Sequence, residues 1–113
     1  NGENIYPETI EHKLNRYPQL VESLVLENRG KIEAWVYPDY DFIDGVTAGQ
    51  SREQRHTYIT SQLEQIRKAV NGQLSSASRL SRILERREPF IKTATHKIKR
   101  YLYTADSISE SSS

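Results

Sequence analysis

The chain has 113 residues, of which 35% are hydrophobic and 27% charged, and its formal net charge is +1. This length suits a single domain with a modest core, and no apolar run reaches the roughly 18 residues that a membrane-spanning helix needs. The chain contains no cysteine, which excludes disulfides and thiolate chemistry and fits a cytoplasmic location.

Charge is spread unevenly along the sequence. Residues 1–78 contain 8 Lys/Arg and 11 Asp/Glu, residues 79–100 contain 8 and 2, and residues 101–113 contain 0 and 2, so their net charges are −3, +6 and −2. The basic segment near the C-terminal end could attract a phosphate-bearing partner. Alternatively, its cations could simply form a solvated basic face.

The first third of the chain predicts a helix followed by a β-hairpin. Pro7 suits the first turn of a helix, and the apolar spacing that follows extends this helix over residues 7–16. Alternating apolar residues then predict strands over residues 20–27 and 31–37. Between them, Asn28-Arg29-Gly30 is expected to form a three-residue hairpin loop with glycine at positive φ.

The middle of the chain predicts a loop and a long helix. Residues 38–49 are polar and rich in turn formers, which indicates an irregular connection. Ser51 followed by Gln54 has the spacing of a capping box, so a helix should begin there. One stripe of apolar residues at helical spacing is expected to cover a sheet face: Ile59, Leu63, Ile66, Val70 and Leu74.

The last third predicts one more strand and little regular structure. Residues 75–78 are expected to be a loop, a third strand begins at Ile83 and ends before Pro89, and a helical turn or two follows over residues 98–103. The predicted fold class is therefore α+β, a three-stranded sheet made of a hairpin plus one strand with helices packed against it. We expect this domain to span residues 1–104, with residues 105–113 as a flexible serine-rich tail.

Two segments at opposite ends of the chain resemble paired signatures of one enzyme superfamily. Residues 1–11, NGENIYPETIE, resemble the Gly-x-x-Ile-x-Pro-x-x-Ile-Glu signature that opens the C-terminal domain of adenylate-forming (AMP-binding) enzymes. Residues 92–100, KTATHKIKR, resemble the terminal Lys-Thr-x-x-Gly-Lys-Ile-x-Arg signature. The two occur in the right order about 80 residues apart, and the chain looks most like bacterial long-chain fatty acyl-CoA synthetases.

This resemblance implies a lid domain that works with a larger N-terminal adenylation domain of the same polypeptide. The family first joins a carboxylic acid to ATP as an acyl-adenylate, and CoA then displaces AMP. ATP, CoA and Mg would be bound mainly by the N-terminal domain, the acid would be a long-chain fatty acid, and a cytoplasmic enzyme could lie peripherally on a membrane. The lid of a short-chain acyl-CoA synthetase or of a peptide-synthetase adenylation domain is an alternative, as is a stand-alone basic binding module.

The resemblance also assigns candidate site residues. Lys97 takes the position of the family's catalytic lysine, which neutralises charge during adenylate formation. His96 stands where many relatives have glycine, and histidine tolerates positive φ less readily. Other residues are predicted to face the CoA pantetheine, Gly2 and Glu3, or to be candidate phosphate contacts, Lys92, His96, Lys99 and Arg100.

Other kinds of site find little support in the sequence. His12 and His56 lack ligand-like spacing, so no metal site is predicted. Basic residues lie near Tyr101 and Tyr103, yet no nucleic-acid motif accompanies them, so nucleic-acid binding is not expected. The fragment also lacks a glycine-rich phosphate loop, so it should be inactive without its partner domain.

Overall fold

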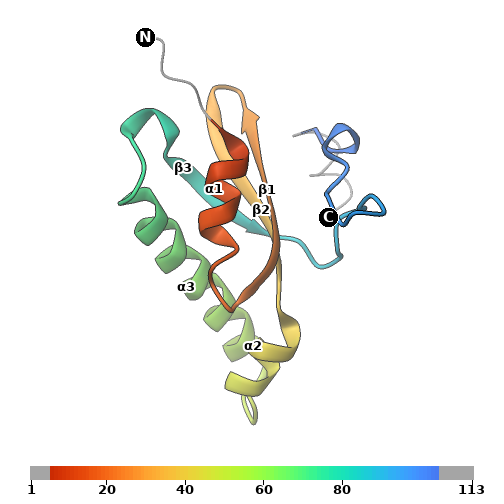
Figure 1. Ribbon diagram of the computed structural model, residues 1–113. Coiled ribbons are helices and arrows are strands. Elements are labelled where there is room, and N and C mark those ends of the chain that lie inside the picture. Colours follow the sequence, from red (N-terminus) through yellow and green to blue (C-terminus); the bar gives the residue numbers. More distant parts are fainter. Residues whose placement is uncertain (1–5, 105–113) are drawn as a thin grey trace.

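A computed structural model describes residues 6–104 and has the predicted α+β fold (Figure 1). The sheet contains β1 (Leu20–Asn28), β2 (Lys31–Pro38) and β3 (Leu80–Glu85), in that spatial order. β1 and β2 form the predicted antiparallel hairpin, and β3 pairs with β2 in parallel. The three-stranded sheet with packed helices is therefore confirmed.

Helices cover one face of the sheet. α1 (Pro7–Leu14) and α3 (Arg52–Asn71) lie on this face, where their apolar stripes meet side chains from all three strands. The predicted capping box is present, because the Ser51 side chain accepts from Gln54 N and the Gln54 side chain accepts from Ser51 N. Burial of an aliphatic stripe against a sheet is the largest stabilising contribution in a domain of this size.

The opposite face of the sheet is covered by the C-terminal segment, residues 86–104 (Figure 1). Leu24 and Trp35 point to this side and pack against Phe90 and Tyr103. The two aromatic rings of the segment meet edge to face, with centroids 5.3 Å apart, an arrangement that aromatic quadrupoles favour. The Arg86 guanidinium lies 5.0 Å from the Phe90 ring centroid and 5.2 Å from that of Tyr103.

Two local predictions, for the hairpin loop and for residues 38–49, were wrong. Part of the expected irregular connection is a helix, α2 (Tyr40–Val46), which Asp39 caps by accepting from Phe42 N at 3.1 Å. The hairpin loop has two residues instead of three, since Asn28 pairs with Lys31. Arg29 and Gly30 have φ of 54° and 81°, and positive φ at both central residues is what a tight type I′ turn requires.

Two boundaries in the last third also differ. β3 begins at Leu80, three residues before Ile83, because Asn71 at the end of α3 bonds both backbone groups of Leu80. The expected helical turn over residues 98–103 is reduced to a single 3₁₀ turn, Arg100–Leu102. The predicted tail, residues 105–113, lies outside the described residues.

Candidate functional site

The second signature forms a small hairpin loop that projects from the C-terminal segment. Lys92 and Ile98 pair as an antiparallel bridge. Thr93 N donates to Lys97 O at 2.8 Å, and Lys99 N donates to Ile91 O at 2.9 Å. These bonds bring both ends of residues 92–98, here called the Lys97 loop, close together.

Positive φ at His96 shapes the tip of the Lys97 loop. His96 has φ of 65°, a left-handed conformation that glycine adopts at lower cost. His96 N donates to Thr93 O at 2.9 Å, and Lys97 N donates to the Thr93 hydroxyl at 3.2 Å. Histidine therefore adopts here the backbone conformation that glycine would adopt most easily, and the amides of His96 and Lys97 both have acceptors.

Lys97 extends from this loop at the border of a groove. Its side chain is exposed and has no hydrogen-bond or ion-pair partner among residues 6–104. The groove has a volume of about 550 Å³ and lies between α1, β1 and the Lys97 loop. Several ionisable side chains line it: Glu8, Glu11, His12, Glu22, Lys92, His96, Lys97 and Arg100.

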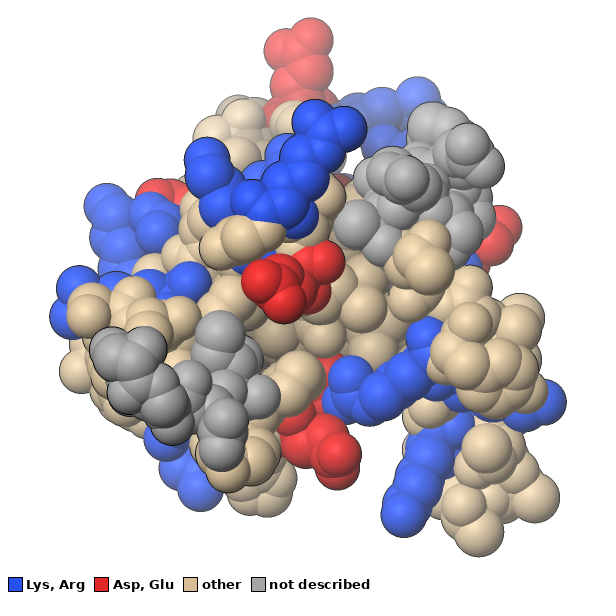
Figure 2. Space-filling model, turned by 90° about the horizontal axis from the view of Figure 1, so that it is seen from above, with Lys and Arg blue, Asp and Glu red and all other residues tan. Residues whose placement is uncertain are grey.

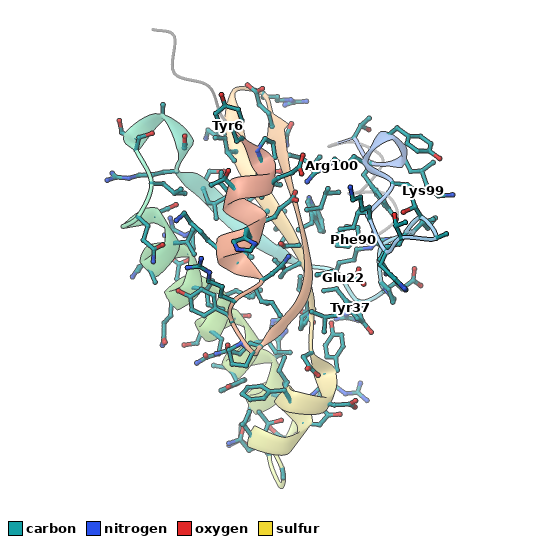
Figure 3. The ribbon with its side chains drawn as sticks, in the orientation of Figure 1. Tyr6, Glu22, Tyr37, Phe90, Lys99 and Arg100 are labelled. Atoms are coloured by element: carbon teal, nitrogen blue, oxygen red, sulfur yellow. The ribbon has the colours of Figure 1, made fainter. Side chains whose placement is uncertain are left out.

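Glu22 of β1 joins the sheet to the start of the Lys97 loop. Its Oε1 accepts from Phe90 N at 3.0 Å, and its Oε2 accepts from Lys92 Nζ at 2.5 Å. Lys92 Nζ also donates to Phe90 O at 2.9 Å. Figure 3 places Glu22 and Phe90 where β1 meets the C-terminal segment. Both oxygens of one half-buried carboxylate thus hold this segment.

Glu11 of α1 makes the corresponding connection after the Lys97 loop. Its Oε2 accepts from Val25 N at 2.7 Å, and its Oε1 forms an ion pair with Arg100. Burial raises the pKa of Glu11 above its ordinary value of 4.5, while the bond from Val25 N and the charge of Arg100 oppose this shift. One carboxylate therefore satisfies a backbone donor of edge strand β1 and also binds the residue that ends the second signature.

Most of the predicted site residues meet at this groove. Lys92, His96, Lys97 and Arg100 all line it, whereas Lys99 does not. Lys92 and Arg100 each have a carboxylate partner, which distinguishes their surroundings from those of Lys97. Residues 2 and 3, the predicted pantetheine face, lie outside the described residues.

The sequence alone did not reveal the part played by the two carboxylates. Glu11 is known from the sequence only as the end of the first signature, and Glu22 lies in neither signature. Glu22 alternates with Leu24 and Leu26 along β1, so an acidic residue on an otherwise apolar strand face was the available signal. What the alternation could not reveal was that Lys92, 70 residues away, lies opposite.

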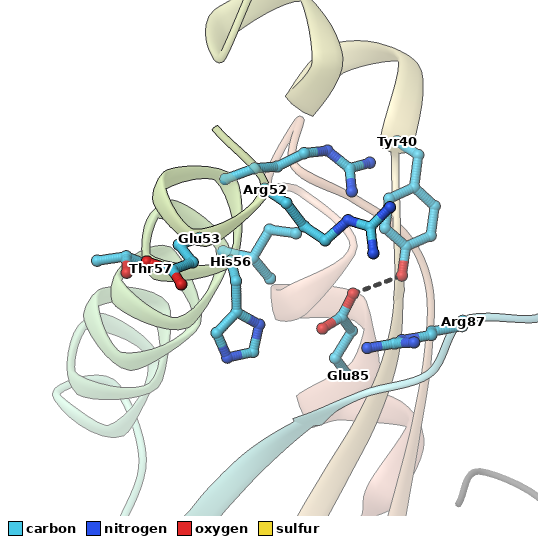
Figure 4. Close-up of a pocket in the computed structure, with 9 residues that line it drawn as sticks. Tyr40, Arg52, Glu53, His56, Thr57, Glu85 and Arg87 are labelled. Atoms are coloured by element: carbon cyan, nitrogen blue, oxygen red, sulfur yellow. Dashed lines mark hydrogen bonds between the residues drawn. The ribbon is translucent and has the colours of Figure 1, made fainter. Parts of the chain in front are cut away.

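A second hollow, with a volume of about 790 Å³, lies beside the start of α3 (Figure 4). The Tyr40 hydroxyl donates to Glu85 at 2.6 Å inside it, and burial together with this bond raises the pKa of Tyr40. Arg52 and Arg87 line it as well. This hollow shares no lining residue with the groove beside Lys97 and contains no residue that the signatures assign.

On the face seen in Figure 2, basic and acidic side chains are interspersed, and the basic ones do not form one continuous patch. Within residues 6–104, no group of three or more His, Asp or Glu side chains is arranged to hold a metal ion. No helix in this range combines the length and apolar character needed to cross a membrane.

No family model and no curated protein matches the chain, but solved structures do. An acyl-CoA synthetase from Brucella canis is 21% identical, with 97% of this chain and 18% of that chain covered and a TM-score of 0.62. A Mycobacterium tuberculosis fatty acyl CoA synthetase is 19% identical over 96% and 19%, with a TM-score of 0.62. A benzoate CoA ligase from Burkholderia xenovorans LB400 is 21% identical over 88% and 18%, with a TM-score of 0.59.

The chain shares its fold with a part of these ligases. It spans less than a fifth of the length of each of the three. Almost the whole of this chain is nevertheless included in the match to the Brucella canis structure. The likeness therefore extends over the helix-covered sheet and the C-terminal segment together.

Proposed function

We propose that this chain is the C-terminal lid domain of an adenylate-forming acyl-CoA ligase, and that Lys97 is its catalytic residue. The single observation that carries the proposal is the position of Lys97, an exposed ammonium that has no partner among residues 6–104 and lies on a loop of the predicted signature. Two findings support a domain that works with a larger one: the chain shares its fold with these ligases, and it spans less than a fifth of their length.

The charge of Lys97 suits the first step of adenylate formation. When a carboxylate attacks the α-phosphate of ATP, two negatively charged groups must approach each other, and charge shifts to the pyrophosphate that leaves. A lysine provides a compact positive charge on a long stem, and a positioned charge in such a site contributes roughly 3 kcal/mol to transition-state stabilisation. In this proposal Lys97 contacts the acid and the phosphate oxygens and transfers no proton.

The described residues fit only part of what ATP, CoA and Mg require. Lys97 and the neighbouring His96 could contact a phosphate, whereas residues 6–104 contain no cluster of metal ligands. Oxygen ligands are what Mg²⁺ prefers, so the larger domain would hold the metal and most of the nucleotide. Gly2 and Glu3 would face the pantetheine of CoA in the second step, and a long-chain fatty acid is the proposed acid.

The proposal is tested with Lys97→Ala in the polypeptide that joins this chain to its large adenylation domain. Acid-dependent exchange of pyrophosphate into ATP should fall on the order of 10²- to 10³-fold, since the charge that neutralises the reacting groups is gone. Thioester formation from supplied acyl-adenylate should be largely retained. Lys68→Ala, which removes an exposed lysine on α3, is the matched control and should leave both rates unchanged.

Two results would contradict the proposal. Full exchange activity after Lys97→Ala would remove its catalytic role, and equal loss of both steps would remove the assignment to the first one. A panel of fatty, short-chain, aromatic and amino acids then tests the acid class, because a long-chain ligase should prefer the fatty acids with the longest chains.

A further inference from the structure

The position of the Lys97 loop depends on contacts outside the loop. Its internal hydrogen bonds, from Thr93 N to Lys97 O and from His96 N to Thr93 O, define its shape. The bridge between Lys92 and Ile98 joins the loop to itself and not to β1, β2 or β3. Something else must therefore hold this loop against the body of the domain.

Ile98 packs against the cluster that includes Leu24 and Trp35, and two carboxylates on different elements supply the polar contacts. Glu22 of β1 binds Phe90 N just before the loop at 3.0 Å and Lys92 Nζ at its first residue at 2.5 Å. Glu11 of α1 binds Arg100 just after it and is itself fixed to β1 by Val25 N at 2.7 Å. Lys97 lies between the two anchored cations in the sequence.

We propose that Glu22 and Glu11 are positioning residues, which clamp the Lys97 loop at both ends so that its ammonium projects at a defined place on the lid. This inference rests on the proposed function of Lys97. The clamp also gives Lys92 and Arg100 a structural task, which differs from the direct phosphate contact that the signature suggested.

The place that the Lys97 ammonium can reach depends on how the loop is held. The lysine stem is flexible, so the region that its ammonium can reach is set by where the backbone of residue 97 is held. Displacement of a catalytic group by about 1 Å can cost on the order of 100-fold in rate. Support from residues that do not touch the substrate is therefore required for a precise site.

Charged groups at these positions indicate that the contacts position the loop and do not chiefly stabilise the fold. Each carboxylate loses hydration on burial, and burial raises the pKa of Glu11. An apolar pair of similar volume is often as stable as a buried ion pair. Ion pairs and bonds to Phe90 N and Val25 N, by contrast, fix both distance and direction.

A double-mutant cycle in the polypeptide that carries the large domain tests the clamp. Glu22→Gln removes the ion pair and can still accept from Phe90 N, and Lys92→Met removes the other partner. Each change should lower acid-dependent pyrophosphate exchange about 10-fold and should spare thioester formation from supplied acyl-adenylate. The double variant should be no slower than the slower single variant, because both changes break one interaction.

Glu33→Gln is the matched control. Glu33 is a buried carboxylate of β2 that pairs with Arg82 at 2.7 Å, and within residues 6–104 it forms no hydrogen bond or ion pair with the Lys97 loop. This variant should keep full exchange activity. Thermal unfolding of every variant distinguishes a folded domain with a displaced loop from a domain that does not fold. Where Glu22→Gln leaves the melting temperature unchanged, the exchange activity of Glu22→Ala is measured as well.

The outcomes distinguish failure of the clamp from failure of the proposed function. If Lys97→Ala stops exchange but Glu22→Gln, Glu22→Ala and Lys92→Met do not slow it, the clamp is overturned and the catalytic lysine stands. If the effects of Glu22→Gln and Lys92→Met are additive, Lys92 acts directly on substrate and the clamp is overturned. Equal loss of both steps would also overturn it, whereas an active Lys97→Ala variant would overturn the proposed function itself.

Discussion

The two faces of the sheet are covered in different ways. On one face, α1 and α3 bury an aliphatic cluster that includes Leu14 and Val70. On the other, a segment without a regular helix relies on the aromatic side chains of Phe90 and Tyr103 and on the ion pairs of Glu11 and Glu22. The helical face therefore supplies most of the buried apolar contact, and the segment face carries the candidate catalytic lysine.

The two faces should differ in local stability. Many small contacts hold the helical face, so no single one decides whether it forms. A few named contacts hold the segment, so single substitutions should loosen it while the helices and hairpin persist. Substitutions on the two faces test that contrast.

Leu63→Ala should destabilise the whole domain. Leu63 is 7% exposed and belongs to the α3 stripe of the aliphatic cluster. Its truncation should lower the free energy of unfolding by about 2–5 kcal/mol, because it removes buried apolar area and leaves a cavity. Chemical denaturation followed by circular dichroism measures this loss; a change confined to the C-terminal segment would contradict the contrast between the faces.

Tyr103→Phe should loosen the segment alone. The Tyr103 hydroxyl accepts from Ile91 N at 2.8 Å, and loss of such a bond costs about 0.5–1.5 kcal/mol. Amide hydrogen exchange should accelerate at Ile91, Thr93 and Lys99 but not within α3. Tyr58→Phe, which changes a tyrosine packed against the helical cluster, is the matched control. If Tyr58→Phe accelerated exchange at the same segment amides, the segment would not be a separate unit.

His96→Gly should stabilise the loop slightly. A left-handed conformation costs a side-chain-bearing residue roughly 1–2 kcal/mol, and glycine adds about 0.5–1 kcal/mol of backbone entropy to folding. The net gain should be about 0.5 kcal/mol, seen as slower exchange of the Thr93 amide. Arg29→Gly makes the same test at φ of 54° in the β1–β2 turn. Faster amide hydrogen exchange in both variants would refute the backbone argument.

Glu11→Gln should change how stability depends on pH. Because burial raises the pKa of Glu11 above 4.5, the folded chain holds this proton more tightly than the unfolded chain does. The associated stability is present below the unfolded pKa and is lost as pH rises through the folded pKa. As pH rises from about 3.5, below the ordinary carboxyl pKa, the free energy of unfolding should therefore fall for the native chain relative to Glu11→Gln. An opposite slope would show that Arg100 outweighs burial.

Local patterns predicted much of the fold. The capping box at Ser51, the apolar stripe after it and the alternation along β1 and β2 each depend on neighbours within a few residues. Such patterns could not predict α2, because its seven residues lack a long apolar stripe and its stability comes from the Asp39 cap and buried Ile43. The start of β3 was also missed, since Asn71 determines it from another element.

For the site, the resemblance of nine consecutive residues around Lys97 to a known signature was enough to select Lys97 as the candidate catalytic residue. Which of its basic neighbours are paired with carboxylates became visible in the folded chain alone. Glu22 and Lys92 are 70 residues apart, and Glu11 and Arg100 are 89 apart. Contacts over such separations arise from the packing of the segment on the sheet, which no local pattern encodes.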